Sequence, residues 1–156
     1  MSEQITVRLC KGASEYSKLV SIWHSAVSSN YDFLTPDDIA FYRKRVTEFY
    51  LPSVFLTVAE VDGVACGFAG IANGKLEMMF VEDQYRGTGV GTALMNDALA
   101  REPALTLSVN EQNEHAVEFY KRHGFVIDGR SDLDADERPF PLLHMTYSGA
   151  AVGAKN

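Results

Sequence analysis

The chain has 156 residues, with 46% hydrophobic residues, 22% charged residues and a net charge of −7. This is the composition of one globular domain, and the acidic balance argues against a nucleic-acid-binding protein, which normally has a basic face. Two cysteines are too few for a disulfide framework. No apolar stretch is long enough to span a bilayer and the first residues lack the apolar core of a secretion signal, so we expect a cytoplasmic protein without a membrane partner.

The first third of the chain predicts a strand followed by two helices. Residues 5–9 alternate between apolar and polar side chains as a strand does, and residues 14–29 have apolar residues at helical spacing with Ser14 as N-cap. The run Thr35-Pro36-Asp37-Asp38 is a good helix start, because Thr caps, Pro fits the first helical position and acids favour the first turn. We expect this second helix to reach about Tyr50.

Residues 53–82 predict a three-stranded antiparallel meander. Apolar and β-branched runs are separated by Asp62-Gly63 and Asn73-Gly74, which are strong hairpin signals. In the last of these strands, alternation would place one set of side chains on each face. The two sets are Leu76, Met78 and Phe80 on one face and Glu77, Met79 and Val81 on the other.

The remaining segments predict helices and strands in alternation. A helix at residues 89–101 lies between two strands, which implies a parallel pair with a right-handed crossover. Asn113 is the expected N-cap of a helix at residues 114–123, and two closing strands follow. The fold class is therefore α+β, close to α/β: one domain at residues 1–148, with a mixed, mostly antiparallel sheet of about seven strands and about four helices in the order βααβββαβαββ. The small-residue tail at 149–156 is expected to be disordered.

A glycine-rich loop joins the meander to the following helix in the stretch "MFVEDQYRGTGVGTALM". Its N–H groups and those of the first helical turn would form a cluster of donors, next to the positive end of the helix dipole and to Arg86. Gly87, Gly89 and Gly91 would let a ligand approach the backbone closely. The loop thus predicts a phosphate or pyrophosphate site, although it fits neither the P-loop nor the dinucleotide motif and a plain glycine turn is the alternative.

Two motifs resemble the signatures of the GNAT (GCN5-related) N-acetyltransferases. "QYRGTGVG", residues 84–91, is similar to the signature Q/R-x-x-G-x-G/A, with Gln84, Gly87 and Gly89 at the fixed positions. "NEQNEHAVEFYKRHGF", residues 110–125, is similar to the second signature, with an Asn, a helix carrying Tyr and then Gly-Phe. The predicted element order also matches this family. Within it, "WHSAVSSNYDFLTPDD" and "PFPLLHMTY" resemble the small bacterial YjaB-type members.

The resemblance implies acetyl-CoA as cosubstrate, with its pyrophosphate on the glycine loop. It also implies that the strand before the loop pairs with the pantetheine arm through its backbone, and that Asn113 contacts this arm. The cofactor-binding residues implied in this way are Met79, Phe80, Val81, Gln84, Arg86, Gly87, Thr88, Gly89, Val90, Gly91 and Asn113.

The resemblance also suggests which residues act in catalysis. Acetyl transfer needs an uncharged amine and a proton for the leaving thiolate, and Tyr120 matches the family tyrosine that supplies that proton. Without the resemblance, Tyr120 would be interpreted as a core residue. Glu77 is the expected base, because it is an acid within an apolar strand, where burial would make it a stronger base. A water chain is the main alternative, and His24 and His144 are weaker ones. The family further suggests a backbone N–H near Met79 as the oxyanion donor.

The acceptor is expected to be a primary amine, either a protein lysine or a small molecule. Candidate substrate-binding residues are Tyr31, Phe33, Asn110 and His144. No paired His or Cys spacing suggests a metal. The chain could form a homodimer, since many members of the family dimerise. The alternatives are a non-catalytic CoA-binding regulatory module and a protein for another phosphate ligand.

Overall fold

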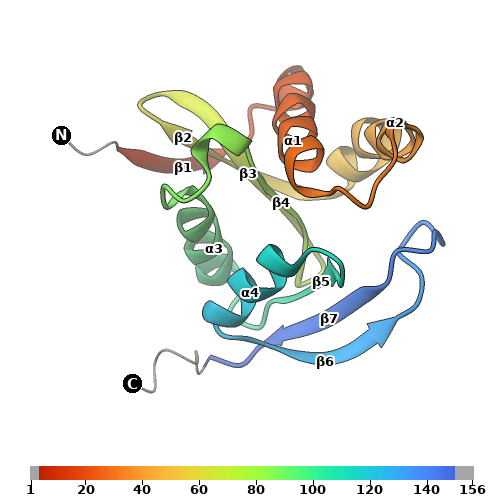
Figure 1. The fold of residues 1–156 in the computed structure, drawn as a ribbon. Helices are drawn as coiled ribbons and strands as arrows, with labels where there is room; N and C mark the ends of the chain where they lie inside the picture. Colours follow the sequence, from red (N-terminus) through yellow and green to blue (C-terminus); the bar gives the residue numbers. More distant parts are fainter. Residues whose placement is uncertain (1–3, 150–156) are drawn as a thin grey trace.

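The computed structural model describes residues 4–149, which form one mixed sheet with helices on both faces (Figure 1). The elements follow the order βααβββαβαββ, so the predicted α+β fold is confirmed. The strands are β1 (Ile5–Leu9), β2 (Phe55–Val61), β3 (Val64–Ala72), β4 (Lys75–Val81), β5 (Thr106–Asn110), β6 (Phe125–Ser131) and β7 (Leu142–Tyr147). The helices are α1 (Tyr16–Asn30), α2 (Pro36–Arg45), α3 (Val90–Arg101) and α4 (Glu114–Arg122).

The structure bears on the expected absence of a membrane span and on the end of the chain. In the described part of the chain, no helix is both long and apolar enough to cross a membrane. The predicted tail at residues 149–156 lies outside the described residues, except for Gly149.

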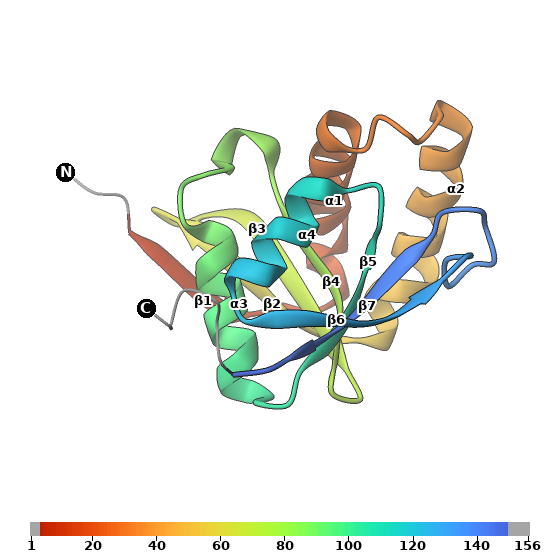
Figure 2. The same ribbon diagram turned by 60° about the horizontal axis from the view of Figure 1, so that its bottom comes forward.

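The sheet opens between its two central strands. Its strand order is β1-β2-β3-β4-β5-β7-β6, and every neighbouring pair is antiparallel except β4 and β5. That parallel pair is formed only by Lys75 with Thr106 and Leu76 with Leu107, at the start of both strands. This pairing confirms the predicted parallel pair. Beyond these residues β4 and β5 diverge and leave a gap in the middle of the sheet (Figure 2).

Helices cover the two faces of the sheet with separate apolar cores. On one face, α3 and α4 pack through residues such as Leu94 and Tyr120 against Leu107 and Met145. On the other face, α1 packs through residues such as Trp23 against the β2–β4 meander (Figure 1). The two cores hold the halves of the sheet on either side of the central gap.

The helix starts follow the local chemistry at α2 but not at α1. Thr35 and Asp38 form a capping box, in which Thr35 Oγ1 accepts from Asp38 N at 3.1 Å and Asp38 Oδ2 accepts from Thr35 N at 3.0 Å. The predicted cap at Ser14 is wrong, because a 3-10 turn precedes α1 and its N-cap position is held by Glu15, which makes no capping bond. The predicted helix to Tyr50 is α-helical only to Arg45 and continues as a π-helical turn.

A β-bulge in β4 overturns the predicted alternation of side chains. Gly70 pairs with Met78 while Ile71 pairs with Leu76, so that Glu77 is an extra residue in the strand. Leu76 therefore packs on the α3 face, and Met78 packs on the α1 face. Glu77 is exposed rather than buried. The burial argument for Glu77 as a base is thus wrong, and only its position can support that role.

A salt-bridge cluster joins β1 to the start of α1. The Arg8 guanidinium donates to Glu15 at 2.5 Å and to Glu60 at 2.6 Å, and the backbone N–H of Lys11 donates to Glu15 at 2.9 Å. These contacts lower the pKa of Glu15 from 4.5 to about 2, and the hydrogen bond from Arg8 makes the largest contribution. Because the folded pKa lies below the unfolded one, the stabilisation is complete above about pH 4.5 and is lost as the pH falls toward 2.

We therefore expect Glu15→Gln to lower the free energy of unfolding by about 2 kcal/mol at pH 7, the size typical of a hydrogen-bonded charge. Since Gln resembles the protonated acid, the difference from the wild type should shrink as the pH falls from 4.5 toward 2. Urea unfolding of both proteins at pH 7 and pH 3 measures this. An equal difference at the two pH values would contradict the assignment of the shift to Arg8.

Candidate active site

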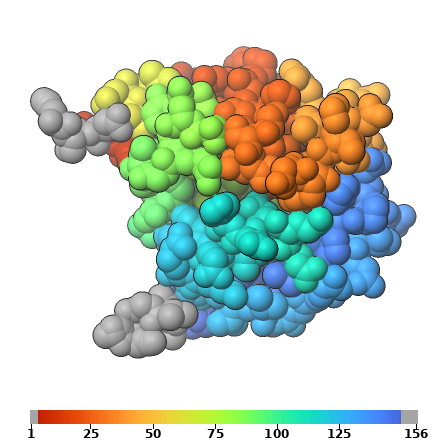
Figure 3. All heavy atoms as spheres, in the orientation of Figure 1, coloured from red at the N-terminus to blue at the C-terminus, as the bar shows by residue number. Residues whose placement is uncertain are grey.

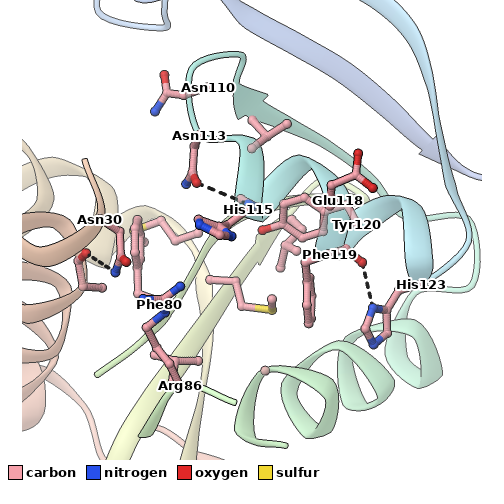
Figure 4. Close-up of a pocket in the computed structure, with 18 of the residues that line it drawn as sticks. Asn30, Phe80, Arg86, Asn110, Asn113, His115, Glu118, Phe119, Tyr120 and His123 are labelled. Atoms are coloured by element: carbon pink, nitrogen blue, oxygen red, sulfur yellow. Dashed lines mark hydrogen bonds between the residues drawn. The ribbon is translucent and has the colours of Figure 1, made fainter. Parts of the chain in front are cut away.

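The gap between β4 and β5 opens into a cavity of about 660 Å³. It is lined by the end of α1, by β4, by the loop before α3, by β5 and by α4, and these segments come together on one face of the molecule (Figure 3). Figure 4 shows that the side chains around it come from segments far apart in the sequence. The predicted residues that line this cavity are Tyr31, Glu77, Met79, Phe80, Val81, Arg86, Gly87, Gly89, Gly91, Asn110, Asn113 and Tyr120.

The glycine loop presents unpaired N–H groups to one end of this cavity. Among the described residues, the backbone N–H groups from Gly87 to Thr92 find no acceptor. Gly87 and Gly89 have φ values of 76° and 96°, which side chains disfavour, and these angles turn the chain into α3. Together with the helix dipole, this cluster of donors suits a phosphate or pyrophosphate group.

Three loop residues are placed differently from the prediction. The side chain of Gln84 is exposed and donates to Glu82, outside the cavity. The Thr88 hydroxyl donates to the carbonyl of Tyr85, so its proton is not free for a ligand. The side chain of Val90 is buried in the core, and only its N–H group belongs to the loop surface.

The far wall of the cavity contains cationic and imidazole groups that the sequence analysis missed. His115, Phe119 and Arg122 follow each other at helical spacing on α4 and line the cavity, as does His123. His123 Nδ1 lies 2.8 Å from the Phe119 carbonyl and therefore donates to it, while Nε2 lies 3.1 Å from Thr92 Oγ1. The sequence could have indicated these residues, because His115, Phe119 and Arg122 fall on one face of the helix that Asn113 caps. Arg122 adds positive charge to the cavity that the loop amides adjoin.

Tyr120 has its hydroxyl in the cavity, as Figure 4 shows. Its ring is buried against Phe119 and Phe125, yet no hydrogen bond to its hydroxyl is found among the described residues. Burial, and to a smaller degree the phenol of Tyr31, raises the pKa of Tyr120 well above its ordinary value of 10. The phenol is therefore protonated at neutral pH and can donate a proton to a group in the cavity.

Asn113 links the start of α4 to Tyr31. Its Oδ1 accepts from the backbone N–H of Ala116 at 3.2 Å, which confirms it as the N-cap of α4. Its side chain also hydrogen-bonds the hydroxyl of Tyr31, which lowers the pKa of that phenol by less than burial raises it. Tyr31, Asn113 and Tyr120 thus form one group on the wall of the cavity.

A second cavity of about 200 Å³ lies across β4, on the α1–α2 side. Aromatic rings form much of its wall, and two carboxylates stand beside them. The residues concerned are Trp23, Tyr31, Tyr42, Tyr50, Phe80, Phe140, Asp134 and Asp136. Both cavities are lined by Tyr31, Glu77, Ser108 and Asn110, so they meet at the gap between β4 and β5.

The wall of the second cavity is partly a loop between β6 and β7 that the sequence analysis did not assign to the site. Asp134 accepts from the hydroxyl of Tyr42, and Asp136 accepts from Tyr50 at 2.7 Å and from Arg45 at 2.8 Å. Burial, followed by the bond to Asp136, raises the pKa of Tyr50 to about 12. The loop is thereby fixed to α2 and to the π-helical turn after it.

Two predicted acceptor residues line neither cavity. Phe33 packs between Tyr31 and Phe140, with ring centroids 5.4 Å and 5.8 Å away, and supports the wall from behind. His144 is engaged at both ring nitrogens, by Ser108 at 2.8 Å and Ser131 at 2.6 Å. Among the described residues, no group of three or more His, Cys, Asp or Glu side chains is placed to hold a metal ion.

Comparison with known proteins agrees with this architecture. A family model described as an acetyltransferase (GNAT) domain matches residues 33–147. The chain belongs to the GNAT acetyltransferases. The predicted family is thereby confirmed, and with it an enzyme that transfers an acyl group. Members of this family use acetyl-CoA, and the unpaired amides of the Gly87–Thr92 loop fit its pyrophosphate.

Several GNAT relatives resemble the chain over most of its length. It is 39% identical over 140 residues to the peptidyl-lysine N-acetyltransferase YjaB of Escherichia coli, covering 87% of this chain and 92% of that protein. It is 31% identical over 115 residues to the peptidyl-lysine N-acetyltransferase YiaC of the same organism, covering 73% and 79%. The predicted likeness to YjaB-type proteins is therefore confirmed.

Solved GNAT structures share the fold. The solution structure of apo-form YjaB from E. coli superposes with a TM-score of 0.85 at 37% identity, covering 93% of this chain and 98% of that one. The PaiA N-acetyltransferase of Thermoplasma acidophilum, solved in complex with coenzyme A, has a TM-score of 0.72 at 17% identity, covering 92% and 99%. At this low identity the second likeness concerns the fold alone.

Proposed function

We propose that this GNAT protein transfers the acetyl group of acetyl-CoA directly to a primary amine, with the side chain of a protein or peptide lysine as the preferred acceptor. The observation that carries the proposal is the free hydroxyl of the buried Tyr120 in the cavity that the unpaired amides of residues 87–92 adjoin. A pyrophosphate held by those amides would leave the thioester arm to run along β4 toward Tyr120.

The reaction joins the amine nitrogen to the carbonyl carbon and breaks the carbon–sulfur bond. The sulfur leaves as a thiolate, and a thiol has a pKa of about 8.5. The phenol of Tyr120 carries its proton at neutral pH because its pKa is raised, and it donates that proton to the sulfur as negative charge develops there. The phenolate recovers a proton from the two that the ammonium group of the acceptor loses, and the other proton leaves to solvent.

The base is proposed to be Glu77 or a water chain beside it. Glu77 is the bulged residue of β4 and lines both cavities, so its carboxylate stands where acceptor and thioester would meet. The role is supported by this position in the lining and by the bulge, and not by burial, because the side chain of Glu77 is exposed.

The second cavity supports a cationic acceptor. Aromatic walls suit an aliphatic chain that ends in an ammonium group, and the carboxylate of Asp134 adds negative charge beside them, whereas Asp136 is already paired with Arg45. Two relatives are named peptidyl-lysine N-acetyltransferases, which supports lysine as the acceptor over other amines. A cytoplasmic location agrees with such a substrate and stays a prediction.

Release of free thiol from acetyl-CoA tests the proposal. We expect turnover with a lysine peptide whose N-terminus is blocked, and at least about tenfold lower kcat/KM with a peptide that offers only its N-terminal amine, because its amine lacks the long aliphatic chain. A polyamine and a free amino acid complete the panel. Binding of CoA without thiol release on any amine would instead indicate a non-catalytic CoA-binding module.

A further inference from the structure

A hydrogen-bonded chain of side chains leads from the central gap across three strands. Ser108 on β5 lines both cavities and is paired in register with His144 on β7. Ser108 Oγ lies 2.8 Å from His144 Nδ1, and Ser131 Oγ on β6 lies 2.6 Å from His144 Nε2. We propose that Ser108, His144 and Ser131 form a relay that carries to solvent the one of the acceptor's two protons that Tyr120 does not recover, a role that rests on the proposed function.

The sheet holds the imidazole of His144 in one orientation. Because each ring nitrogen has its own hydroxyl partner, the ring cannot turn without losing a hydrogen bond. Its carbon Cδ2 also lies over Gly129 of β6, where an added Cβ would come within 3.4 Å of it. The bulge between Ile127 and Gly129 places Gly129 opposite His144, so the imidazole ring packs against this part of β6.

The relay balances in protons. With its proton on Nε2, His144 accepts the hydroxyl proton of Ser108 at Nδ1 while Ser108 Oγ takes a proton from the amine nitrogen. The Nε2 proton then passes to Ser131 Oγ, and the proton of that hydroxyl leaves to water. The amine loses one proton, the solvent gains one and no charge stays behind. The ring returns to its first tautomer by exchange with water after the product leaves.

Ser108 would touch the acceptor and is the catalytic residue of this relay, whereas His144 is a positioning residue that acts through it. The charged side chains on the neighbouring strand make bonds elsewhere: Asp128 accepts from Thr146, and Arg130 pairs with acids at its own end of the sheet. Across the gap, Glu77 is the charged group that lines the same cavities as Ser108, and separate substitution distinguishes its role from that of the relay.

The test compares His144→Gln and Ser108→Ala with the wild type on acetyl-CoA and an N-terminally blocked lysine peptide. We expect kcat at pH 7 to fall about tenfold to a hundredfold in both variants. This loss is at or below the low end of what general acid–base catalysis usually contributes to a rate, because water can partly replace the relay. The KM for acetyl-CoA should stay unchanged. The deficit should shrink as the pH approaches about 10, because a lysine amine with a pKa of about 10.4 then loses its proton without help.

Thr146→Val is the matched control. Thr146 lies two residues from His144 on the same strand and donates to Asp128 of β6, so its loss loosens the same strand pair without touching the relay. We expect wild-type kcat from it. If the wild type turns over but His144→Gln keeps its kcat, or loses the same fraction at every pH, the relay is overturned and the proposed function stands. If the wild type releases no thiol, both are overturned.

Discussion

Tyr120→Phe is expected to lower kcat by about a hundredfold or more, the usual contribution of a general acid. The hydroxyl makes no protein hydrogen bond within the described residues, so its removal leaves no buried partner unsatisfied and should cost little stability. The affinity for CoA should also stay the same, because the amides of residues 87–92 are untouched. Steady-state kinetics, calorimetric binding of CoA and thermal unfolding measure the three quantities.

Tyr147→Phe provides a matched control for this substitution. The rings of Tyr120 and Tyr147 both pack against Phe125, with centroids 6.0 Å and 5.4 Å away, but Tyr147 lines neither cavity. Its kcat should equal that of the wild type. A Tyr120→Phe variant with full kcat would move the acid role to another group, whereas equal losses in both variants would point to packing around Phe125.

The elements that the sequence predicts well are those whose chemistry is local. Asp62 and Asn73 have φ values of 51° and 52°, as two-residue hairpin turns require, and the residues of each turn specify this without the rest of the fold. The capping box of α2 is equally local. Ser14 is not the cap because it lies inside a 3-10 turn that precedes α1, and the carboxylate of Glu15 at the N-cap position bonds Arg8 on β1 instead of the helix start. Helical periodicity does not reveal such a contact between a strand and a helix.

The same distinction applies to the site. The glycine loop and Tyr120 each lie in a contiguous motif, and the structure brings both to one cavity. The exposure of Glu77 depends on how β4 pairs with β3, and alternation along one strand cannot reveal a bulge. The acidic wall of the second cavity depends on a bond between Tyr42 and Asp134, which are far apart in the sequence. His144 was predicted as a substrate contact, whereas its bonds to Ser108 and Ser131 place it behind the cavity wall.

Substitution of Gly87 by alanine in the glycine loop is expected to weaken CoA binding strongly. Gly87 has a φ of +76° with no atom within 4 Å of an added Cβ, so Gly87→Ala meets no steric clash and acts only through the backbone and the ligand. An alanine at this angle is strained by about 1–2 kcal/mol and would draw the loop N–H groups out of alignment. Since a hydrogen bond to a charged group contributes about 1.5–3 kcal/mol, we expect CoA to bind about tenfold to a hundredfold more weakly.

Gly63→Ala separates this effect from strain alone. Gly63 in the turn between β2 and β3 has a φ of +84° and equally open surroundings, yet it lines neither cavity. Both variants should lose similar stability in thermal unfolding, while only Gly87→Ala should raise the Kd for CoA and the KM for acetyl-CoA. Because Tyr120 is untouched, kcat at saturating acetyl-CoA should stay near the wild-type value. Equal CoA affinities in the two variants would mean that the N–H groups of this loop do not hold the pyrophosphate.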